Sequence, residues 1–280
     1  MLDTKTIKKI TEFVYAKPRS INEIAALLDK NWRTADSYID KISKELGTIT
    51  SRTFRGGTRG ALKIVYWNNV DKIHSSEFQE RLFKRIESAK DKQDFSPFDI
   101  YQYVPDEQRY AFLEKQSENI ITKKQNLVNL LRSAENQILI FSGNLTWVTA
   151  RQGKENIITI LEEAAERNIS IKILCKVDVE SIENIKKMLE LNYKLKKELI
   201  EIRHAEQPFR AFVIDDKIAR FKEIKSYEEK KKENNKMHIF YEIRDSEWIA
   251  WIQKIFWNLF RTSIKAEKRI KDIETIENIK

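Results

Sequence analysis

The sequence predicts an α/β protein with two folded parts, and three observations lead to this prediction. Over residues 137–243, buried strand-like runs alternate with amphipathic helical stretches, a pattern typical of a sheet covered by helices on both faces. Residues 19–67 instead resemble two short helices followed by two β-rich runs joined by glycines. A chain of 280 residues is long enough for two domains, each with its own core.

The N-terminal part begins with a helix start signal. Ser20-Ile21-Asn22-Glu23 fits a capping box, in which the serine hydroxyl and the glutamate carboxylate satisfy free backbone N–H groups. A second helix is expected over 31–46, and Gly47 ends it. Its buried side consists of Ala35, Ile39, Ile42 and Leu46. Runs 48–54 and 61–67, joined by 55–60, then predict a hairpin with a basic, glycine-rich tip, and this order is that of a winged helix-turn-helix over 1–72.

The exposed side of the second helix has the chemistry of a DNA reader. It carries Asn31, Arg33, Thr34, Ser37, Tyr38 and Lys41. Asn31, Arg33 and Ser37 are the expected base-edge contacts, because short polar and bidentate side chains read bases in the major groove. The expected phosphate contacts are Lys41, Arg52, Arg55 and Arg59. The segment resembles the winged helix domains of archaeal-type transcriptional regulators, in which Asn31-Trp32-Arg33-Thr34-Ala35 is similar to the start of the recognition helix. Protein docking is the alternative role of such a domain.

Charge and composition narrow the class of protein. The formal net charge is +9, and residues 1–72 hold 14 Lys and Arg against 8 Asp and Glu, a surplus of six. This asymmetry indicates a polyanion, here double-stranded DNA, as partner, although a general lysine-rich composition would have the same effect. The one cysteine, Cys175, excludes a disulfide framework. With no signal peptide and no run long enough to cross a bilayer, we expect a soluble, cytoplasmic protein without a membrane partner.

The middle of the chain predicts helices. Residues 73–107 are expected to form a helical linker that includes a charged amphipathic helix over about 75–92. A long helix is predicted over 108–133, in which apolar residues recur at near-heptad spacing. They are Leu113, Ile120, Leu127 and Leu131. Such a helix could form a coiled coil in a homodimer that reads two half-sites, or it could pack on its own second domain.

The second domain, over 108–264, is built from strands and helices in alternation. Strands are expected at 137–143, 169–175, 200–203 and 237–243, with helices at 155–167 and 181–196 between them. Residues 209–214 and 217–221 predict a hairpin around Asp215-Asp216. Aromatic residues from Trp248 to Phe260 line one side of a C-terminal helix, and they predict a docking face for the core or for a second subunit. Residues 225–236 are expected to form a solvated charged loop, and 265–280 a charged tail.

Residues 210–219 are similar to part of a phospholipase D-like domain, and the resemblance spans about 108–262. Active members carry a His-x-Lys-x4-Asp strand, in which the histidine attacks phosphorus and the lysine stabilises charge on phosphate oxygens. Placing Asp215 at the motif aspartate puts Arg210 at the lysine and Pro208 at the histidine. Because proline has no nucleophile and the Gly-Ser-x-Asn motif is also missing at 222–225, we expect no catalysis. The alternative is a phosphodiesterase or nuclease that uses His204 as a displaced nucleophile.

A winged helix joined to a degenerate phospholipase D-like domain resembles the TrmB-like transcription regulators. The resemblance implies a C-terminal domain that senses a small molecule or mediates assembly. Ligands of open α/β sheets bind outside the carboxyl ends of strands. The expected ligand contacts are Asn144, Lys176, His204 and Arg210. An anion or a sugar stacked on Trp147 would fit, and neither a cofactor nor a metal is expected, because the three histidines are scattered singly.

Overall fold

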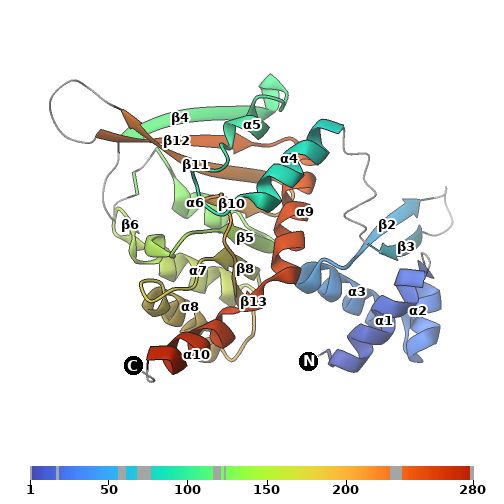
Figure 1. Ribbon diagram of the computed structural model, residues 1–280. Helices are drawn as coiled ribbons and strands as arrows, with labels where there is room; N and C mark the ends of the chain where they lie inside the picture. Colours follow the sequence, from blue (N-terminus) through green and yellow to red (C-terminus); the bar gives the residue numbers. More distant parts are fainter. Residues whose placement is uncertain are drawn as a thin grey trace. The chain divides into compact units, whose positions relative to one another are not determined.

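The chain divides into unit 1, Met1–His74, and unit 2, Ser75–Lys280. The structure is a computed structural model that describes residues 2–16, 19–55, 61–67, 77–115, 121–122, 124–227 and 235–277 (Figure 1). The predicted fold class is confirmed: helices and strands alternate in unit 2, and a small helical and β-sheet unit precedes it.

Unit 1 has the element order of a winged helix. Its elements are α1 (Thr4–Ala16), β1 (Arg19–Ser20), α2 (Ile21–Leu28), α3 (Trp32–Leu46), β2 (Ile49–Arg55) and β3 (Ala61–Trp67). The strands form an antiparallel sheet in the order β1-β3-β2. The strand β1 was not expected from the sequence; in it Arg19 pairs with Val65 and Ser20 with Ile64.

Local signals position the two central helices of unit 1. The capping box at the start of α2 is confirmed: the Glu23 N–H donates to the Ser20 hydroxyl at 3.2 Å, and the Ser20 N–H donates to the Glu23 carboxylate at 2.8 Å. Asp29 ends α2 and Gly47 ends α3, each in the left-handed region, with φ of 51° and 62°. The three helices and the sheet enclose one apolar core. Its fully buried members include Ile10, Ile24, Ala35, Ile39 and Ile49.

Unit 2 is built on one mixed sheet of eight strands in the order β13-β9-β8-β5-β10-β11-β12-β4. Within this sheet β8 pairs in parallel with β5 and with β9, and all other neighbouring strands pair antiparallel. The strands are β4 (Arg109–Lys115), β5 (Gln137–Phe141), β8 (Ser170–Cys175), β9 (Ile200–His204), β10 (Ala211–Ile214), β11 (Ile218–Tyr227), β12 (Asn235–Ile243) and β13 (Ile264–Lys265). A separate two-stranded ribbon joins β6 (Arg151–Gln152) to β7 (Glu155–Asn156).

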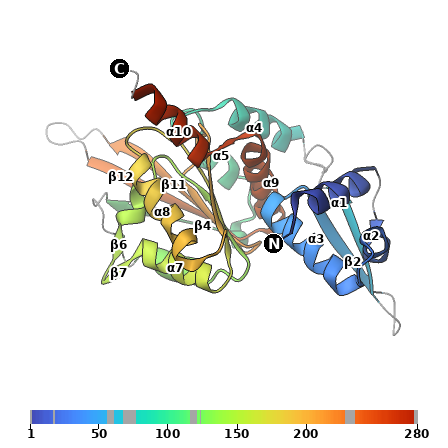
Figure 2. The same cartoon turned by 90° about the horizontal axis from the view of Figure 1, so that it is seen from below.

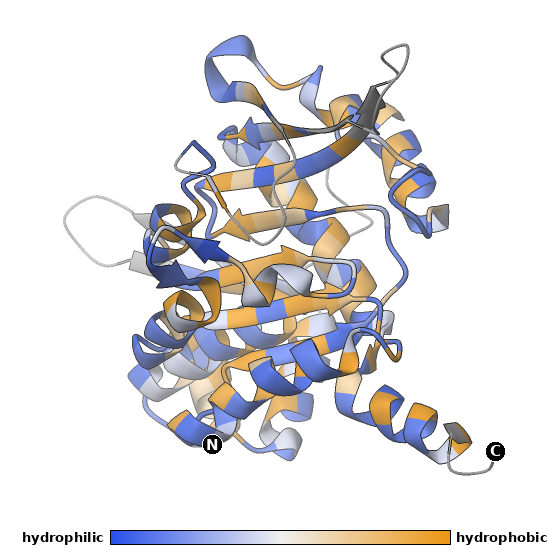
Figure 3. Ribbon diagram, turned by 90° about the vertical axis from the view of Figure 1, so that its left-hand side faces the viewer, coloured by the Kyte–Doolittle hydropathy of each residue, from blue (hydrophilic) through white to orange (hydrophobic). Residues whose placement is uncertain are grey.

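Helices cover both faces of this sheet. One apolar core lies under α6 (Leu127–Arg132), α7 (Ile157–Glu166), α8 (Ile182–Leu195) and α10 (Ala266–Glu277). The opposite core lies under α4 (Glu77–Ser88), α5 (Phe98–Tyr101) and α9 (Ser246–Thr262). Two short 3-10 helices occupy Asp106–Gln108 and Thr146–Thr149. Figure 2 shows α7 and α8 side by side, and in Figure 3 hydrophobic residues concentrate along the central strands.

The predicted helix over 108–133 is wrong. Residues 109–115 form the edge strand β4, whose Phe112 pairs with Phe240 of β12. In this strand Phe112 and Glu114 are buried and Leu113 is 54% exposed. Side chains alternate between the two faces of the strand that pairs with β12, so the near-heptad spacing of apolar residues does not describe their burial. Leu113 lies in a strand and Leu127 in α6, so they share no helix. The predicted coiled coil through this helix is therefore wrong as well.

The C-terminal segment is also more ordered than expected. The aromatic side of α9 packs against the sheet, where Trp248, Ile252 and Phe256 are buried, so the docking face belongs to the unit's own core. The charged tail expected from 265 onward instead forms the edge strand β13 and the helix α10. Ala266 and Ile270 of α10 are buried against the first core, because their spacing of four places them on one helix face.

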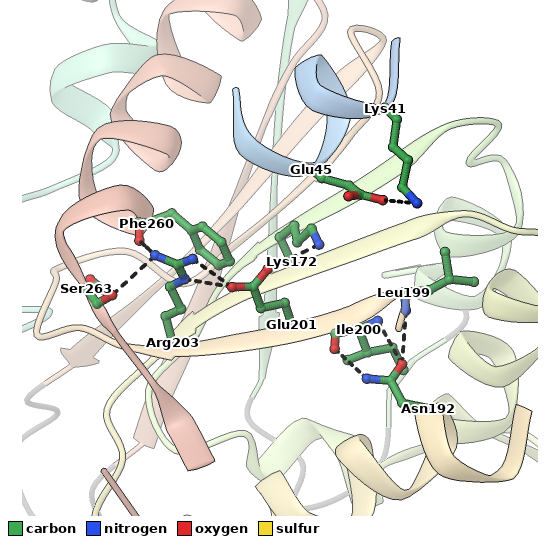
Figure 4. A network of polar contacts seen from close by, with 10 residues as sticks. All are labelled: Lys41, Glu45, Lys172, Asn192, Leu199, Ile200, Glu201, Arg203, Phe260 and Ser263. Atoms are coloured by element: carbon green, nitrogen blue, oxygen red, sulfur yellow. Dashed lines mark hydrogen bonds and ion pairs between the residues drawn. The ribbon is translucent and has the colours of Figure 1, made fainter. Parts of the chain in front are cut away.

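A polar network fixes the α9 end to the edge of the sheet (Figure 4). The Arg203 guanidinium donates to the carbonyl of Phe260 at 2.8 Å and to that of Ser263 at 3.3 Å. It also pairs with Glu201, which in turn contacts Lys172 at 3.4 Å. Arg203 therefore serves as a structural link between β9 and α9.

Candidate functional site

The first candidate site is the exposed side of α3. Ala35, Ile39 and Ile42 are buried, and this orientation leaves Arg33, Ser37, Asp40 and Lys44 exposed on the opposite side. Trp32 is 53% exposed, and the Arg33 guanidinium lies 5.6 Å from the centre of its ring. Arg33 makes no ion pair within the part of the chain that the structure describes. The N-terminal turn of α3 thus presents an aromatic ring and a cation to solvent.

Asn31 has a structural task that the sequence analysis did not assign. It is the N-cap of α3, and its Oδ1 accepts from the Thr34 N–H at 2.9 Å and from the Thr34 hydroxyl at 3.1 Å. A bidentate contact with adenine needs both the oxygen and the NH2 group of an asparagine. Because the cap occupies the oxygen, only the NH2 group of Asn31 is available without loss of the cap.

Acidic side chains of α3 form ion pairs with the nearby lysines. Lys63 of β3 contacts both Asp36 and Asp40 of α3, the latter at 2.9 Å, and this contact ties the hairpin to the helix. Lys41 pairs with Glu45 at 3.6 Å, and both side chains are partly exposed. Such exposed pairs contribute little stability, so Lys41 can exchange its partner for a phosphate at small cost. Tyr38 is partly buried against the core of unit 1.

The hairpin cations were the other predicted phosphate contacts. Arg52 and Arg55 belong to β2, which pairs with β3 over its whole length. Their side chains, and all of Arg59, lie outside the described residues. The prediction that these three arginines contact the DNA backbone therefore stays a prediction.

The second candidate site is a cavity of about 460 Å³ in unit 2. It lies where the parallel strands β5, β8 and β9 end, since Ser142, Lys176 and Ala205 line it. Three of the four predicted ligand residues line it together: Asn144, Lys176 and Arg210. Six cations contribute to the wall: Lys90, Lys92, Lys176, Arg210, Arg220 and Lys222. The three carboxylates are Asp91, Asp178 and Glu206, so the lining has a surplus of three positive charges.

His204, the fourth predicted ligand residue, does not line the cavity. It ends β9, where it pairs with Ile264 of β13, and its Nδ1 accepts the Val177 N–H at 2.9 Å. Burial, and then the charge of Arg269, lower the pKa of His204 below its usual value. The imidazole therefore serves as a neutral acceptor that fixes the backbone after β8.

Two cations in the cavity lie on adjacent strands. Arg210 directly precedes β10, and the Lys222 N–H donates to its carbonyl at 2.7 Å, which extends the β10–β11 ladder by one pair. Burial lowers the pKa of Arg210, against an opposing effect of Asp91. Burial, and then the charge of Lys92, lower the pKa of Lys222. Lys222 was not among the ligand residues expected from the sequence. Counting outward from a two-residue Asp215-Asp216 turn pairs Arg210 with Phe221, whereas the observed pairing of Ile214 with Ile218 puts Lys222 opposite Arg210.

The Arg210 guanidinium lies close to Gly143. A Cβ atom at Gly143 would lie 2.6 Å from one Nη and 2.9 Å from the Nε of Arg210, so a larger residue would push the guanidinium away. The Nη1 donates to the Phe209 carbonyl at 2.6 Å. Gly143 therefore leaves room for the guanidinium beside the turn that follows β5.

Aromatic side chains form the apolar part of the cavity wall. Trp147 donates its indole N–H to the Ser142 hydroxyl at 2.9 Å and meets Phe212 edge to face, with ring centres 5.2 Å apart. Phe240 also lines the cavity and stacks on Phe112 at 4.9 Å. The predicted stacking residue Trp147 is therefore at the cavity, with its polar atom already bonded.

The residues around Pro208 and Asp215 make structural contacts. Pro208 is buried, and the neighbouring Gln207 side chain donates to the Ser142 carbonyl at 2.8 Å and accepts the Phe209 N–H at 2.6 Å. Asp215 is 1% exposed and accepts three backbone N–H groups, from Glu135 and Asn136 at 2.9 Å and from Gln137 at 2.8 Å. It has a φ of 47°, as the predicted turn residue requires. This carboxylate fixes the start of β5.

The described residues offer neither a metal centre nor a membrane-spanning helix. No group of three or more His, Cys, Asp or Glu in them has an arrangement that could hold a metal ion. None of the helices described combines the length and apolar character needed to span a bilayer. Cys175 is buried at the end of β8, where burial raises its pKa to about 12 and leaves the thiol unreactive.

No family model and no curated protein matches the sequence. Solved structures similar to the chain include Nuc from Salmonella typhimurium, a phospholipase D family member, with 12% identity, a TM-score of 0.41, and coverage of 56% of this chain and 97% of Nuc. NucT from Helicobacter pylori has 17% identity and a TM-score of 0.40, and the match covers 56% of this chain and 99% of NucT.

A third structure is similar over both units. TrmBL2, described as an archaeal chromatin protein with a novel mode of DNA binding, has 14% identity and a TM-score of 0.39, and the match covers 94% of each chain. At TM-scores of 0.39 to 0.41, these similarities are too loose to transfer a site or an activity to this chain.

Proposed function

We propose that this chain is a sequence-specific, DNA-binding transcription regulator that reads duplex DNA with α3 and contacts the backbone with the β2–β3 hairpin. The observation that carries the proposal is the first turn of α3, which presents Trp32 and Arg33 to solvent in a unit with the winged-helix element order. The positive charge surplus of residues 1–72 favours a polyanionic partner.

Residue roles follow from the geometry of α3. Arg33 is the proposed base reader, because its guanidinium fork can donate two hydrogen bonds to one guanine. Asn31 would contribute its NH2 group while its oxygen caps the helix, and Ser37 lies one turn further along the same exposed side. Lys41, Arg52, Arg55 and Arg59 stay the proposed phosphate contacts.

The test compares two substitutions of Arg33 on selected genomic duplexes. If Arg33 reads a base, both Arg33→Ala and Arg33→Lys weaken binding to the preferred duplex by about 1–3 kcal/mol. Lysine keeps the charge of arginine but lacks the guanidinium fork that contacts the base. Binding to random duplexes should stay near wild type in Arg33→Lys. Lys8→Ala, which removes a cation paired with Glu12 on α1, is the matched control.

The outcomes separate three roles. A loss that is equal on all sequences in Arg33→Ala and absent in Arg33→Lys would make Arg33 a phosphate contact. Failure of the wild type to retain any duplex at low salt would contradict DNA binding and favour protein docking by unit 1. A homodimer, which two half-sites require, would appear as a palindromic selected sequence.

Unit 2 is proposed to sense a ligand or mediate assembly and not to catalyse. The position of the motif histidine is Pro208, and His204 lies outside the cavity lining with its Nδ1 bonded to Val177. We expect no hydrolysis of bis(4-nitrophenyl) phosphate beyond the rate of a mock preparation. Hydrolysis that copurifies with the protein and is lost in His204→Ala would contradict this and restore the phosphodiesterase alternative.

A further inference from the structure

The cavity of unit 2 contains a pair of like charges that the fold alone does not require. Arg210 and Lys222 occupy directly opposed positions of the extended β10–β11 ladder, as the 2.7 Å bond from the Lys222 N–H to the Arg210 carbonyl shows. Side chains at opposed positions project from the same face of a sheet with Cβ atoms about 5 Å apart, and like charges there are destabilising. Both side chains line the cavity.

Neither cation has a carboxylate partner in the described part of the chain. Asp91 and Glu114 act electrostatically on Arg210 and Lys222 respectively, and neither forms an ion pair with them. Glu114 instead accepts hydrogen bonds from Thr122 and Gln125. By contrast, Arg220 at the same cavity is paired with Glu242 at 2.7 Å. The two cations therefore line, without a carboxylate partner, a cavity whose lining already has a surplus of positive charge, and one Arg210 donor is bonded to the Phe209 carbonyl.

An aromatic wall adjoins the charged pair. Phe212 lies two residues after Arg210, and Phe240 pairs with Lys222 across β11 and β12. With Trp147 they form an apolar wall, and the cavity of about 460 Å³ lies within the size range of small-molecule sites. Cations beside aromatic faces recognise a ligand that has a charged end and a flat apolar end.

We propose that this cavity binds an organic phosphate monoester with an aromatic ring, of the nucleoside monophosphate class. The phosphate lies between Arg210 and Lys222, and the ring lies against Phe212, Phe240 and Trp147. A monoester carries about −1.5 to −2 charges at neutral pH, which two cations match better than a carboxylate does. The guanidinium nitrogens other than Nη1, which donates to the Phe209 carbonyl, donate to phosphate oxygens, and the lysine ammonium binds as a point charge. The proposal does not depend on DNA binding by unit 1.

Calorimetric titration of the full-length protein tests each part of the proposal. The probes are AMP, inorganic phosphate, adenosine and benzoate. We expect AMP to bind at least about tenfold more tightly than phosphate, and adenosine and benzoate to bind weakly or not at all. Lys222→Met should weaken AMP binding by about tenfold or more, whereas Lys187→Gln, which removes a lysine paired with Glu183 on α8, should leave it unchanged.

Thermal unfolding shows whether Lys222→Met loses AMP binding because the site has changed or because the protein has lost its fold. In chloride buffer, Lys222→Met should melt at or above the wild-type temperature, because the substitution removes a partly buried charge and its repulsion from Arg210. AMP should raise the melting temperature of the wild type and not that of the variant. No binding of AMP by the wild type, equal binding by Lys222→Met, or adenosine as tight as AMP would overturn the proposal.

Discussion

Asp215 offers the sharpest test of how buried hydrogen bonds stabilise unit 2. Its carboxylate accepts three backbone N–H groups at 2.8–2.9 Å from residues 135–137 and is 1% exposed. Hydrogen bonds to a charged group contribute about 1.5–3 kcal/mol each, so removal of all three should cost about 4–5 kcal/mol even at the lower value. The hydrogen bonds of Asp215 should therefore stabilise the fold of unit 2.

Three substitutions resolve this cost into parts. Asp215→Gly removes the acceptors and suits the φ of 47°, so it should show the full loss. Asp215→Asn tolerates the left-handed backbone and keeps one oxygen, which places an NH2 group against one N–H donor, and it should lose about 1.5–3 kcal/mol. Asp216→Asn, at the exposed neighbouring position of the same turn, is the control and should have little effect.

The assay uses the one cysteine of the chain. Cys175 is buried in β8, so its labelling by a thiol reagent in increasing urea reports the opening of unit 2 and not of unit 1. The free energy of opening is compared between wild type and variants. A loss below about 1 kcal/mol in Asp215→Gly, or an equal loss in Asp216→Asn, would refute the reasoning that three charge-assisted bonds fix this corner.

Two further predictions concern helix capping and pH. Asn31→Ala should destabilise α3 by about 1 kcal/mol and Asn31→Ser should not, as measured by amide hydrogen exchange of residues 34–46; equal protection in both variants would contradict the cap. Burial, and then the charge of Lys222, lower the pKa of His238 to about 4 from 6.5. The unfolded chain therefore binds a proton that the folded chain does not, so unit 2 should lose stability as pH falls from 6.5 towards 4. His238→Leu should reduce this loss in urea unfolding at pH 7 and pH 5, and an unchanged loss would show that other groups cause it.

Local signals explain why the sequence predicted unit 1 well. The capping box at Ser20 and the stop at Gly47 act within one helical turn, so they are visible in a short window. The role of Asn31 as N-cap was not recognised from the sequence, because asparagine is common both at N-caps and in contacts with bases. Here the hydrogen-bond geometry decided between two uses of a single side chain.

Long-range pairing explains what the sequence did not reveal in unit 2. Residues 109–115 form a strand because β12, more than a hundred residues later, offers a free edge, and a spacing of apolar residues cannot report this. His204 was expected at the cavity from its place after β9, but the edge strand β13 pairs with it. Lys222 lies opposite Arg210 because Ile214 pairs with Ile218, whereas the turn expected at Asp215-Asp216 shifts the register by one residue and places Lys222 opposite Phe209.

The salt dependence of duplex binding tests the central claim most directly. Affinity of the full-length protein for a selected duplex is measured by fluorescence anisotropy between about 50 and 200 mM salt. The account predicts that the logarithm of the affinity falls linearly with the logarithm of salt, with a slope of about 0.9 for each phosphate contacted, and that Arg33→Lys keeps this slope while it loses the preferred sequence. Absence of binding at the lowest salt, or an affinity that does not change with salt, would contradict DNA recognition by α3.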